Sequence, residues 1–193
     1  MPLLTGLGFA FVPRDAALSS PAAPPTAAVS FRVDPVHSHV LFRTKHMGVS
    51  YAHGRFNAFE GKFTLGESPS IQLTIDTSSV DTQSEKRDGH LAGPDFFDSG
   101  QFPRAKFKST KIEDKGDGKY AVTGDLELRG KSKEIRFEAI KVGEGAGPRD
   151  SYLAGLHAGF TIQRSDFGIN YGIENGGVAD DVLLEISLEG IRE

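Results

Sequence analysis

Short segments of alternating apolar and polar residues follow one another along most of this chain. In residues 37–46, for example, Val40, Phe42 and Thr44 lie on one face of an extended chain and the residues between them on the other. Successive residues of a strand point to opposite faces, so this period predicts half-buried strands. The same pattern recurs in residues 31–33, 54–56, 59–63, 71–75, 106–112, 120–128, 134–139, 153–162 and 181–188. Because short turns join most of them, we expect an all-β, antiparallel, meandering sheet, closed as a barrel or packed as a sandwich.

One insert, about residues 83–98, breaks the strand pattern. Thr82 with Glu85 three residues later matches a capping box, which predicts a helix that begins near Ser84. Gly93-Pro94 predicts its end. Three large apolar residues of the insert need a surface to cover, namely Leu91, Phe96 and Phe97. The insert is therefore expected to form a flap over the core, or a crossover that plugs one end.

Glycines and turn residues predict how the strands are connected. Gly54 and Gly61 within strand patterns indicate bulges or tight bends. Residues 65–69 and 114–118 are predicted hairpin loops, and Gly143–Pro148 is a predicted flexible loop. The spacing of glycines in this last segment resembles a phosphate-binding loop, but no helix pattern follows it, so a hairpin loop is the better interpretation.

Composition limits the function classes. The 193 residues suit one domain, and the net charge of −4 with no basic stripe argues against nucleic acid as a partner. Cysteine is absent, which excludes disulfides, cysteine nucleophiles and thiolate metal sites. No motif indicates a cofactor. The 14 Phe residues recur at alternating positions, as residues of a core or a cavity wall would.

Residues 1–28 differ from the rest. An apolar run at residues 3–12, too short to span a bilayer, precedes a segment rich in Ala, Pro and Ser. This is either a signal-like segment without the usual basic start or a disordered tail. The folded domain is predicted to be residues 29–193, and no membrane span is expected in it.

Histidines are the candidates for chemistry. His37 and His39 would share a face of a strand, as half of a metal site or an acid/base pair, but a structural role beside the turn at Asp34-Pro35 is favoured. His46 continues the series of Val40 and faces either a ligand head group at the barrel mouth or a structural partner.

The chain also resembles the YceI-like polyisoprenoid-binding family over about residues 31–190, in a set of ordered motifs. They are Asp34-Pro35-x-His37-Ser38, Phe42, His46, Gly54-x-Phe56, Phe59-x-Gly61, Arg87-Asp88-x-His90-Leu91, Asp95-Phe96-Phe97, Phe102-Pro103, Phe107-x-Ser109, Gly124-Asp125-Leu126-x-Leu128-x-Gly130 and Arg164-x-Asp166-Phe167-Gly168. The resemblance implies a lipocalin-like, eight-stranded antiparallel barrel with a helical insert. It further implies a bound isoprenoid lipid of quinone or polyprenyl type, which the protein carries or sequesters, a periplasmic or secreted location, and a homodimer. The atypical first residues leave a cytoplasmic location as the alternative.

Physical dimensions agree with such a ligand, because an eight-stranded barrel leaves room for one and a strand of eight residues spans about 26 Å. Alternation and size select the expected ligand-binding residues: Phe42, His46, Phe56, Phe63, Ile75, Leu91, Phe96, Phe97, Phe107, Leu126, Phe137 and Phe160. Asp88 and Arg164 are expected to pair and to fix the insert to the barrel. The protein is predicted not to be an enzyme. The alternatives are a metal-dependent or hydrolytic enzyme that uses histidines at the mouth, and a partner-binding barrel with a filled core.

Overall fold

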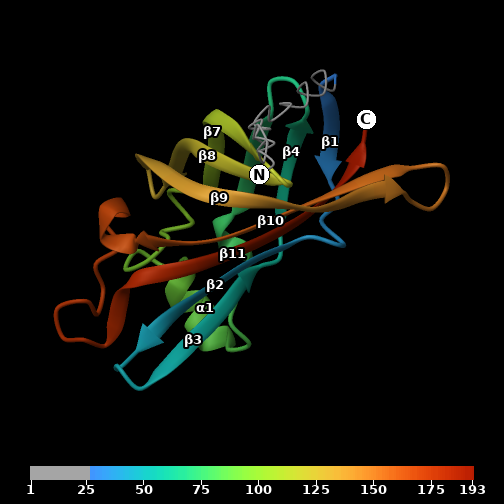
Figure 1. Cartoon of the computed structure of the whole chain (residues 1–193). Coiled ribbons are helices and arrows are strands. Elements are labelled where there is room, and N and C mark those ends of the chain that lie inside the picture. The colour runs from blue at the N-terminus through green and yellow to red at the C-terminus, as the bar shows by residue number, and fades with distance from the viewer. Residues whose placement is uncertain (1–26) are drawn as a thin grey trace, which may run out of the picture.

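The computed structural model describes residues 27–193, and these residues form an antiparallel barrel (Figure 1). The predicted signal-like segment lies almost wholly outside the described residues. The strands are β1 (Val29–Val33), β2 (His39–His46), β3 (Ser50–Phe56), β4 (Phe59–Leu65), β5 (Ser70–Asp76), β6 (Val80–Asp81), β7 (Arg104–Gly116), β8 (Lys119–Leu128), β9 (Lys131–Ala146), β10 (Tyr152–Gln163) and β11 (Val178–Arg192). The helices are the α-helix α1 (Glu85–Ala92) and the 3₁₀ turns η1 (Thr77–Ser79) and η2 (Arg164–Phe167).

The strand segments make up eight barrel strands. The hydrogen-bonded order is β1-β4-β5-β7-β8-β9-β10-β11, and β11 pairs with β1 to close the ring. The remaining segments, β2, β3 and β6, continue β1, β4 and β5 past short interruptions, since β2 pairs with both β11 and β3 and β3 pairs with β6. All pairings are antiparallel. The eight-stranded antiparallel barrel is therefore confirmed, and the sandwich is excluded.

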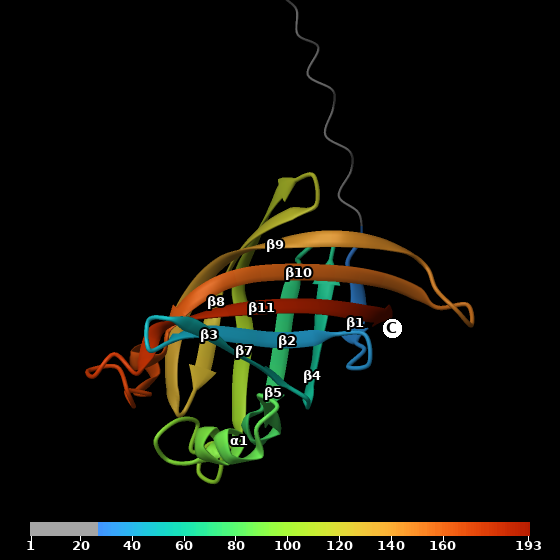
Figure 2. The same cartoon turned by 90° about the horizontal axis from the view of Figure 1, so that it is seen from below.

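The two ends of the barrel differ. At the end where β1 begins and β11 ends, the register pairs Phe31 with both Phe63 and Arg192, so the ring is complete. At the other end, the hairpin of β2 and β3 diverges from β7 and β8, and β6 pairs with β3 at only two positions. The insert with α1 lies at this open side (Figure 2). Within residues 27–193, no helix is long and apolar enough to cross a bilayer.

The helical insert is confirmed, but its capping differs from the prediction. The helix begins after Ser84 and ends before Gly93, yet the Ser84 side chain makes no capping hydrogen bond. Instead, the backbone N–H of Thr82 donates to Oδ1 of Asp88 over 2.9 Å, and the Thr82 hydroxyl donates to the same oxygen. The capping-box interpretation was wrong because Thr82 lies two residues before the N-cap and is bonded to the second turn of the helix.

Gly54 and Gly61 do not form bulges. Both pair in regular register, opposite Phe42 and Leu73. A Cβ on Gly54 would lie 2.2 Å from Cζ of Phe42, so this glycine makes room for a phenyl ring on the neighbouring strand. A glycine in a strand indicates either a bulge or a close approach, and here it is the close approach.

The predicted loop at residues 143–148 was also wrong. Gly143 pairs with Gly155 and Gly145 with Leu153, so β9 continues to Ala146. The turn itself is short, residues 147–151. Pairing with β10 overrides the low strand preference of Gly143 and Gly145, because the long hairpin supplies a partner to both.

Candidate functional site

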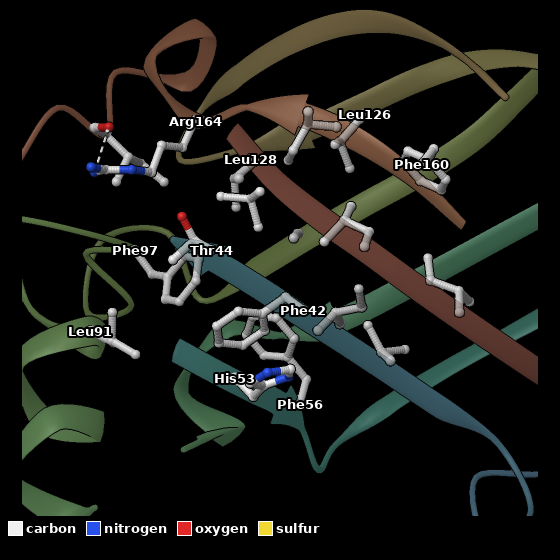
Figure 3. Close-up of a pocket in the computed structure, with 18 of the residues that line it drawn as sticks. Phe42, Thr44, His53, Phe56, Leu91, Phe97, Leu126, Leu128, Phe160 and Arg164 are labelled. Carbon is white, nitrogen blue, oxygen red and sulfur yellow. Dashed lines mark hydrogen bonds between the residues drawn. The ribbon is translucent and has the colours of Figure 1, made fainter. Parts of the chain in front are cut away.

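A cavity of about 480 Å³ lies inside the barrel, within the range typical of ligand sites. Its wall is formed mainly by inward-facing apolar side chains of the barrel strands and of the insert (Figure 3). Val40 and Phe42 on β2 alternate inward as the period predicted, and Leu126 and Phe160 face them from β8 and β10. The cavity rules out the filled-core alternative.

The structure places the predicted residues on this wall, with one exception. The wall includes Phe42, His46, Phe56, Ile75, Leu91, Phe96, Phe97, Phe107, Leu126, Phe137 and Phe160. Phe63 does not line the cavity. It is fully buried and stacks on Phe31 with ring centroids 5.2 Å apart, and a Cβ on Gly190 would lie 2.6 Å from its ring. Phe63 points inward as predicted, but it fills the closed end of the barrel.

Several wall residues were missed. Ile162, Leu184 and Ile186 lie on β10 and β11. Their signal was available, because Leu184 and Ile186 alternate with polar residues in the predicted strand at residues 181–188. The polar wall residues of the insert, of η2 and of the loop after it had no such signal, because these segments do not alternate as a strand does.

Polar groups gather at the mouth of the cavity. Thr82 lies just before the insert, Arg87 and His90 belong to it, and Arg164 and Tyr171 belong to η2 and the following loop. The other end is apolar, with Ile71, Leu73, Leu156 and Leu188 at register positions near Phe63. The cavity is therefore amphipathic along its length, and a ligand with one polar head and a long apolar tail fits this arrangement.

Arg164 is the most enclosed charged group of the mouth, with only 5% of its surface exposed. Its guanidinium donates to the carbonyl oxygens of Ile169, Tyr171, Val178 and Ala179 over 2.8–3.1 Å. Burial lowers the pKa of Arg164, while the charge of Asp180 acts in the opposite direction. Arginine stays charged even so, because its ordinary pKa lies far above neutral. It fixes the loop over residues 168–179 against the barrel.

The predicted Asp88–Arg164 pair was wrong. Asp88 is bonded to Thr82, and Arg164 is occupied by backbone carbonyls. The connection is made by Arg129, whose guanidinium donates to the carbonyl oxygens of Pro94 in the insert and Gly168 after η2. Aromatic contacts add to it, since the ring of Tyr171 lies 4.8 Å from that of His90 and 5.2 Å from that of Phe96.

The insert thus contacts two parts of the mouth, the loop after η2 and strand β3. Phe97 packs edge-on against Phe56 of β3, with ring centroids 5.4 Å apart. Leu91 also faces the cavity (Figure 3). The insert acts as a flap over the open side of the barrel, as the first of its two predicted roles required.

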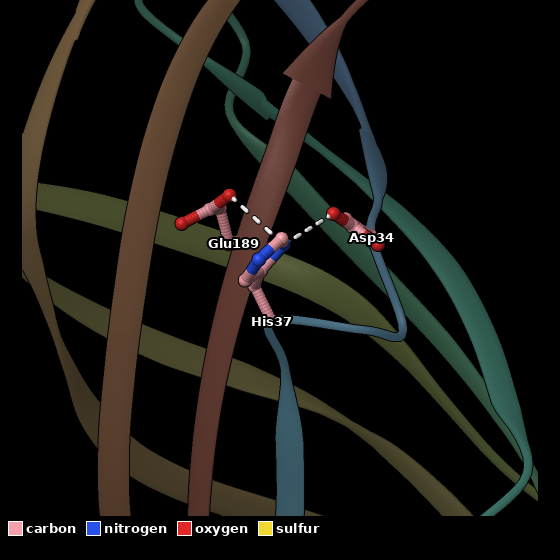
Figure 4. A group of neighbouring side chains, drawn as sticks. All are labelled: Asp34, His37 and Glu189. Atoms are coloured by element: carbon pink, nitrogen blue, oxygen red, sulfur yellow. Dashed lines mark hydrogen bonds and ion pairs between the residues drawn. The ribbon is translucent and has the colours of Figure 1, made fainter. Parts of the chain in front are cut away.

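One histidine of the mouth has a carboxylate partner, since His90 Nε2 lies 3.0 Å from Asp95 Oδ2. Within residues 27–193, a single group of three side chains could share a metal ion, namely Asp34, His37 and Glu189 (Figure 4). His37 Nδ1 lies 2.7 Å from Asp34 Oδ2 and 3.6 Å from Glu189 Oε1, and the other Asp34 oxygen accepts from the Val36 N–H. The hydrogen bond lowers the pKa of Asp34 and raises that of His37.

This histidine group lies outside the cavity. Glu189 follows the inward-facing Leu188 and therefore points outward. It lies about 36 Å along β11 from the start of that strand at the mouth, at roughly 3.3 Å per residue. Ser38 Oγ accepts from the Glu189 N–H, so the corner between β1 and β2 is fixed to β11. His39 begins β2 and is not in the group. The geometry supports the structural interpretation of His37.

Comparisons with known proteins identify relatives of this chain. The family model described as the YceI-like domain matches residues 31–190. A UPF0312 protein of Shewanella oneidensis is 36% identical over 182 residues, which cover 92% of this chain and 94% of that protein. A UPF0312 protein of Pseudomonas paraeruginosa is 39% identical over 172 residues, covering 86% and 88%.

Solved structures share the fold. BcnA of Burkholderia cenocepacia superposes with a TM-score of 0.74 at 28% identity and covers 81% of this chain and 98% of its own. A polyisoprenoid binding domain from Saccharophagus degradans, implicated in plant cell wall breakdown, superposes with a TM-score of 0.67, covering 86% and 99%. At 16% identity, this second likeness concerns the fold alone.

Proposed function

Since the chain belongs to the family of YceI-like domains, we propose that it binds the apolar chain of an isoprenoid lipid inside the barrel and carries or sequesters that lipid. Family membership and the apolar cavity together support a role in lipid binding. One fold neighbour is described as a polyisoprenoid binding domain, and the isoprenoid class of ligand is proposed here from that likeness and from the shape of the cavity.

The amphipathic cavity is the observation that carries the proposal. Transfer of apolar surface out of water contributes about 25 cal/mol per Å². A ligand that buries a few hundred Å² gains several kcal/mol even after the cost of association. A soluble, polar substrate would gain little from the apolar side chains that make up most of the wall.

The mouth suggests the kind of head group. Arg87, His90 and Tyr171 are donors at the opening, and Arg87 Nε and Nη2 bind Thr82. A head with acceptor oxygens suits these donors, as a quinone carbonyl or a polyprenyl phosphate would. Periplasmic or secreted location and a homodimer complete the proposal, as properties of a lipid carrier outside the cytoplasm.

A metal-dependent or hydrolytic enzyme is the alternative. It requires a histidine and a partner at the mouth. The group that could share a metal ion instead lies at the corner of β1 and β2, and its His37 and Asp34 are already bonded to each other. At the mouth, His90 is paired with Asp95 over 3.0 Å, but both side chains are about half exposed, and within residues 27–193 no third ligand joins them in a metal-binding group.

Mass spectrometry of an organic extract tests the proposal. Freshly purified protein is compared with a sample that was heat-denatured and washed before extraction. We expect an isoprenoid quinone or polyprenyl lipid at close to one molecule per chain, and uptake of added ubiquinone by delipidated protein. An extract without isoprenoid, together with no uptake of ubiquinone, would contradict the proposal.

A further inference from the structure

The hairpin between β2 and β3 presents large apolar side chains to solvent. Met47, Val49 and Tyr51 are 60%, 85% and 54% exposed. The turn itself is unusual, because φ is +51° at Met47 and +71° at Gly48, and the Val49 N–H donates to the His46 carbonyl over 3.1 Å. Such a turn favours Asn or Gly at both central positions. Methionine is strained at positive φ, so folding does not explain its presence there.

The same hairpin is basic in an acidic protein. Residues 36–59 contain no Asp or Glu, although the chain has 26 of them. Arg43 and Lys45 project from the outward face of β2, and the guanidinium carbon of Arg43 lies 4.9 Å from the ring centroid of Tyr51. On the neighbouring strand β11, Asp180 is held by two hydrogen bonds from Ser165, whereas Asp181 and Glu185 are exposed, so the excess of basic charge belongs to the hairpin alone. Apolar and basic side chains therefore share one projecting element, the mouth hairpin, which we define as residues 43–53.

The mouth hairpin stands at the opening of the cavity. His46 and Ser50, which flank its turn, line the cavity, and the Met47 N–H donates to the Gly177 carbonyl over 3.0 Å. This bond joins the hairpin to the loop that carries Tyr171, whose side chain is also exposed. In two perpendicular views, the hairpin and this loop project together at the end opposite the C-terminus (Figures 1 and 2).

We propose that the mouth hairpin docks on an anionic membrane surface. Met47 and Val49 would enter the acyl region of the bilayer. Tyr51 would lie at the interface, and Arg43 and Lys45 would bind lipid phosphates. Charge complementarity favours this partner, because basic residues near an anionic bilayer are each attracted to it, and apolar side chains at a hairpin tip gain by leaving water. The inference deepens the proposed function, since docking places the cavity opening where a membrane lipid can enter.

Vesicle flotation of the full chain tests the docking. Vesicles of phosphatidylcholine alone are compared with vesicles that also contain phosphatidylglycerol. We expect binding to the anionic vesicles that weakens as salt is added. Val49→Ser should weaken it roughly tenfold, from the lost burial of one valine side chain. Val142→Ser is the matched control, since Val142 is 70% exposed on β9 and should leave binding unchanged.

Two further variants separate the contributions. Met47→Asn installs a residue that suits positive φ, so the fold is retained while the apolar contact is lost, and binding should fall. Lys45→Gln should weaken binding about fivefold, whereas the exposed Lys108 on β7, changed to Gln, should have no effect.

The experiments distinguish a failure of membrane docking from a failure of lipid binding in the cavity. Neither Met47 nor Val49 lines the cavity, so these variants should still take up ubiquinone. Wild-type protein that takes up ubiquinone but does not float with anionic vesicles would overturn the docking and leave the proposed function intact. If Val142→Ser weakened vesicle binding as much as Val49→Ser does, the docking proposal would also be overturned. Loss of a dimer in Val49→Ser, seen by analytical ultracentrifugation without any vesicle binding in the wild type, would assign the hairpin to a second copy instead.

Discussion

Replacing Phe42 by Ala tests the cavity most directly. Phe42 lies on β2, lines the cavity, and packs 5.6 Å from the ring of Phe56 over the space that Gly54 leaves open. One side of the ring meets protein and another faces the cavity. The substitution therefore removes contact with any ligand while the strand pairing of β2 with β3 and β11 remains.

The size of the effect follows from the contact area. If the ring gives about 60 Å² of contact to the ligand, then at about 25 cal/mol per Å² the loss is about 1.5 kcal/mol. This corresponds to a rise in Kd of about tenfold. Phe63→Leu is the matched control, because Phe63 is also an inward phenylalanine but is packed on Phe31 outside the cavity. It should lower the free energy of unfolding by about 1–2 kcal/mol, partly through lost stacking, and leave Kd unchanged.

Two measurements on each variant distinguish the sites. Binding of ubiquinone to delipidated protein gives Kd, and urea denaturation gives the free energy of unfolding. We expect Phe42→Ala to change mainly the first and Phe63→Leu only the second. The opposite pattern, with ligand binding lost in folded Phe63→Leu and unchanged in Phe42→Ala, would refute the assignment of the cavity.

Three other substitutions have defined outcomes. Gly54→Ala places a Cβ 2.2 Å from Cζ of Phe42, and the displaced ring should lower the free energy of unfolding by about 1–3 kcal/mol in urea denaturation. Arg164→Met leaves four carbonyl groups without their donor, so it should cost about 3 kcal/mol or more and speed hydrogen exchange over residues 168–179. Asp34→Asn removes the partner that raises the pKa of His37, so His37 should titrate nearer its ordinary value by NMR. Because the pKa is raised in the folded protein, this pair stabilises fully below the unfolded value of about 6.5 and loses its effect as pH rises through the folded value, so wild type and variant should differ in Tm near about pH 6 and converge at alkaline pH.

The sequence predicted which side chains face the inside of the barrel better than it predicted how far along the barrel each one lies. The series Val40, Phe42, Thr44 and His46 faces the cavity because a strand must alternate, and the insert begins and ends near its predicted residues. Alternation cannot say how far along the barrel a side chain lies. Phe63 shares the inward direction of Phe42 but belongs to the closed end, and only the pairing of β4 with β1 determines that.

Polar contacts were the least predictable part. The hydrogen-bond partners of Asp88 and Arg164 depend on how the insert and the loop after η2 pack against the barrel. No local sequence pattern encodes this packing. Arg129 connects these elements from a turn far from both in sequence. Gly54 and Gly143 show the same limit for the backbone, since a glycine permits several geometries and its neighbours select one.

The buried, stacked rings of Phe31 and Phe63 close one end of the barrel, and the mouth of the cavity lies at the other. An apolar chain that occupies the cavity must leave by the route it took to enter, so its head group is the last part to enter and the first to emerge. Such a protein cannot act as a conduit between two compartments or two membranes at once. If it carries a lipid as proposed, loading and unloading are separate encounters, and the rate of transfer depends on how often one face of the molecule meets its donor and its acceptor.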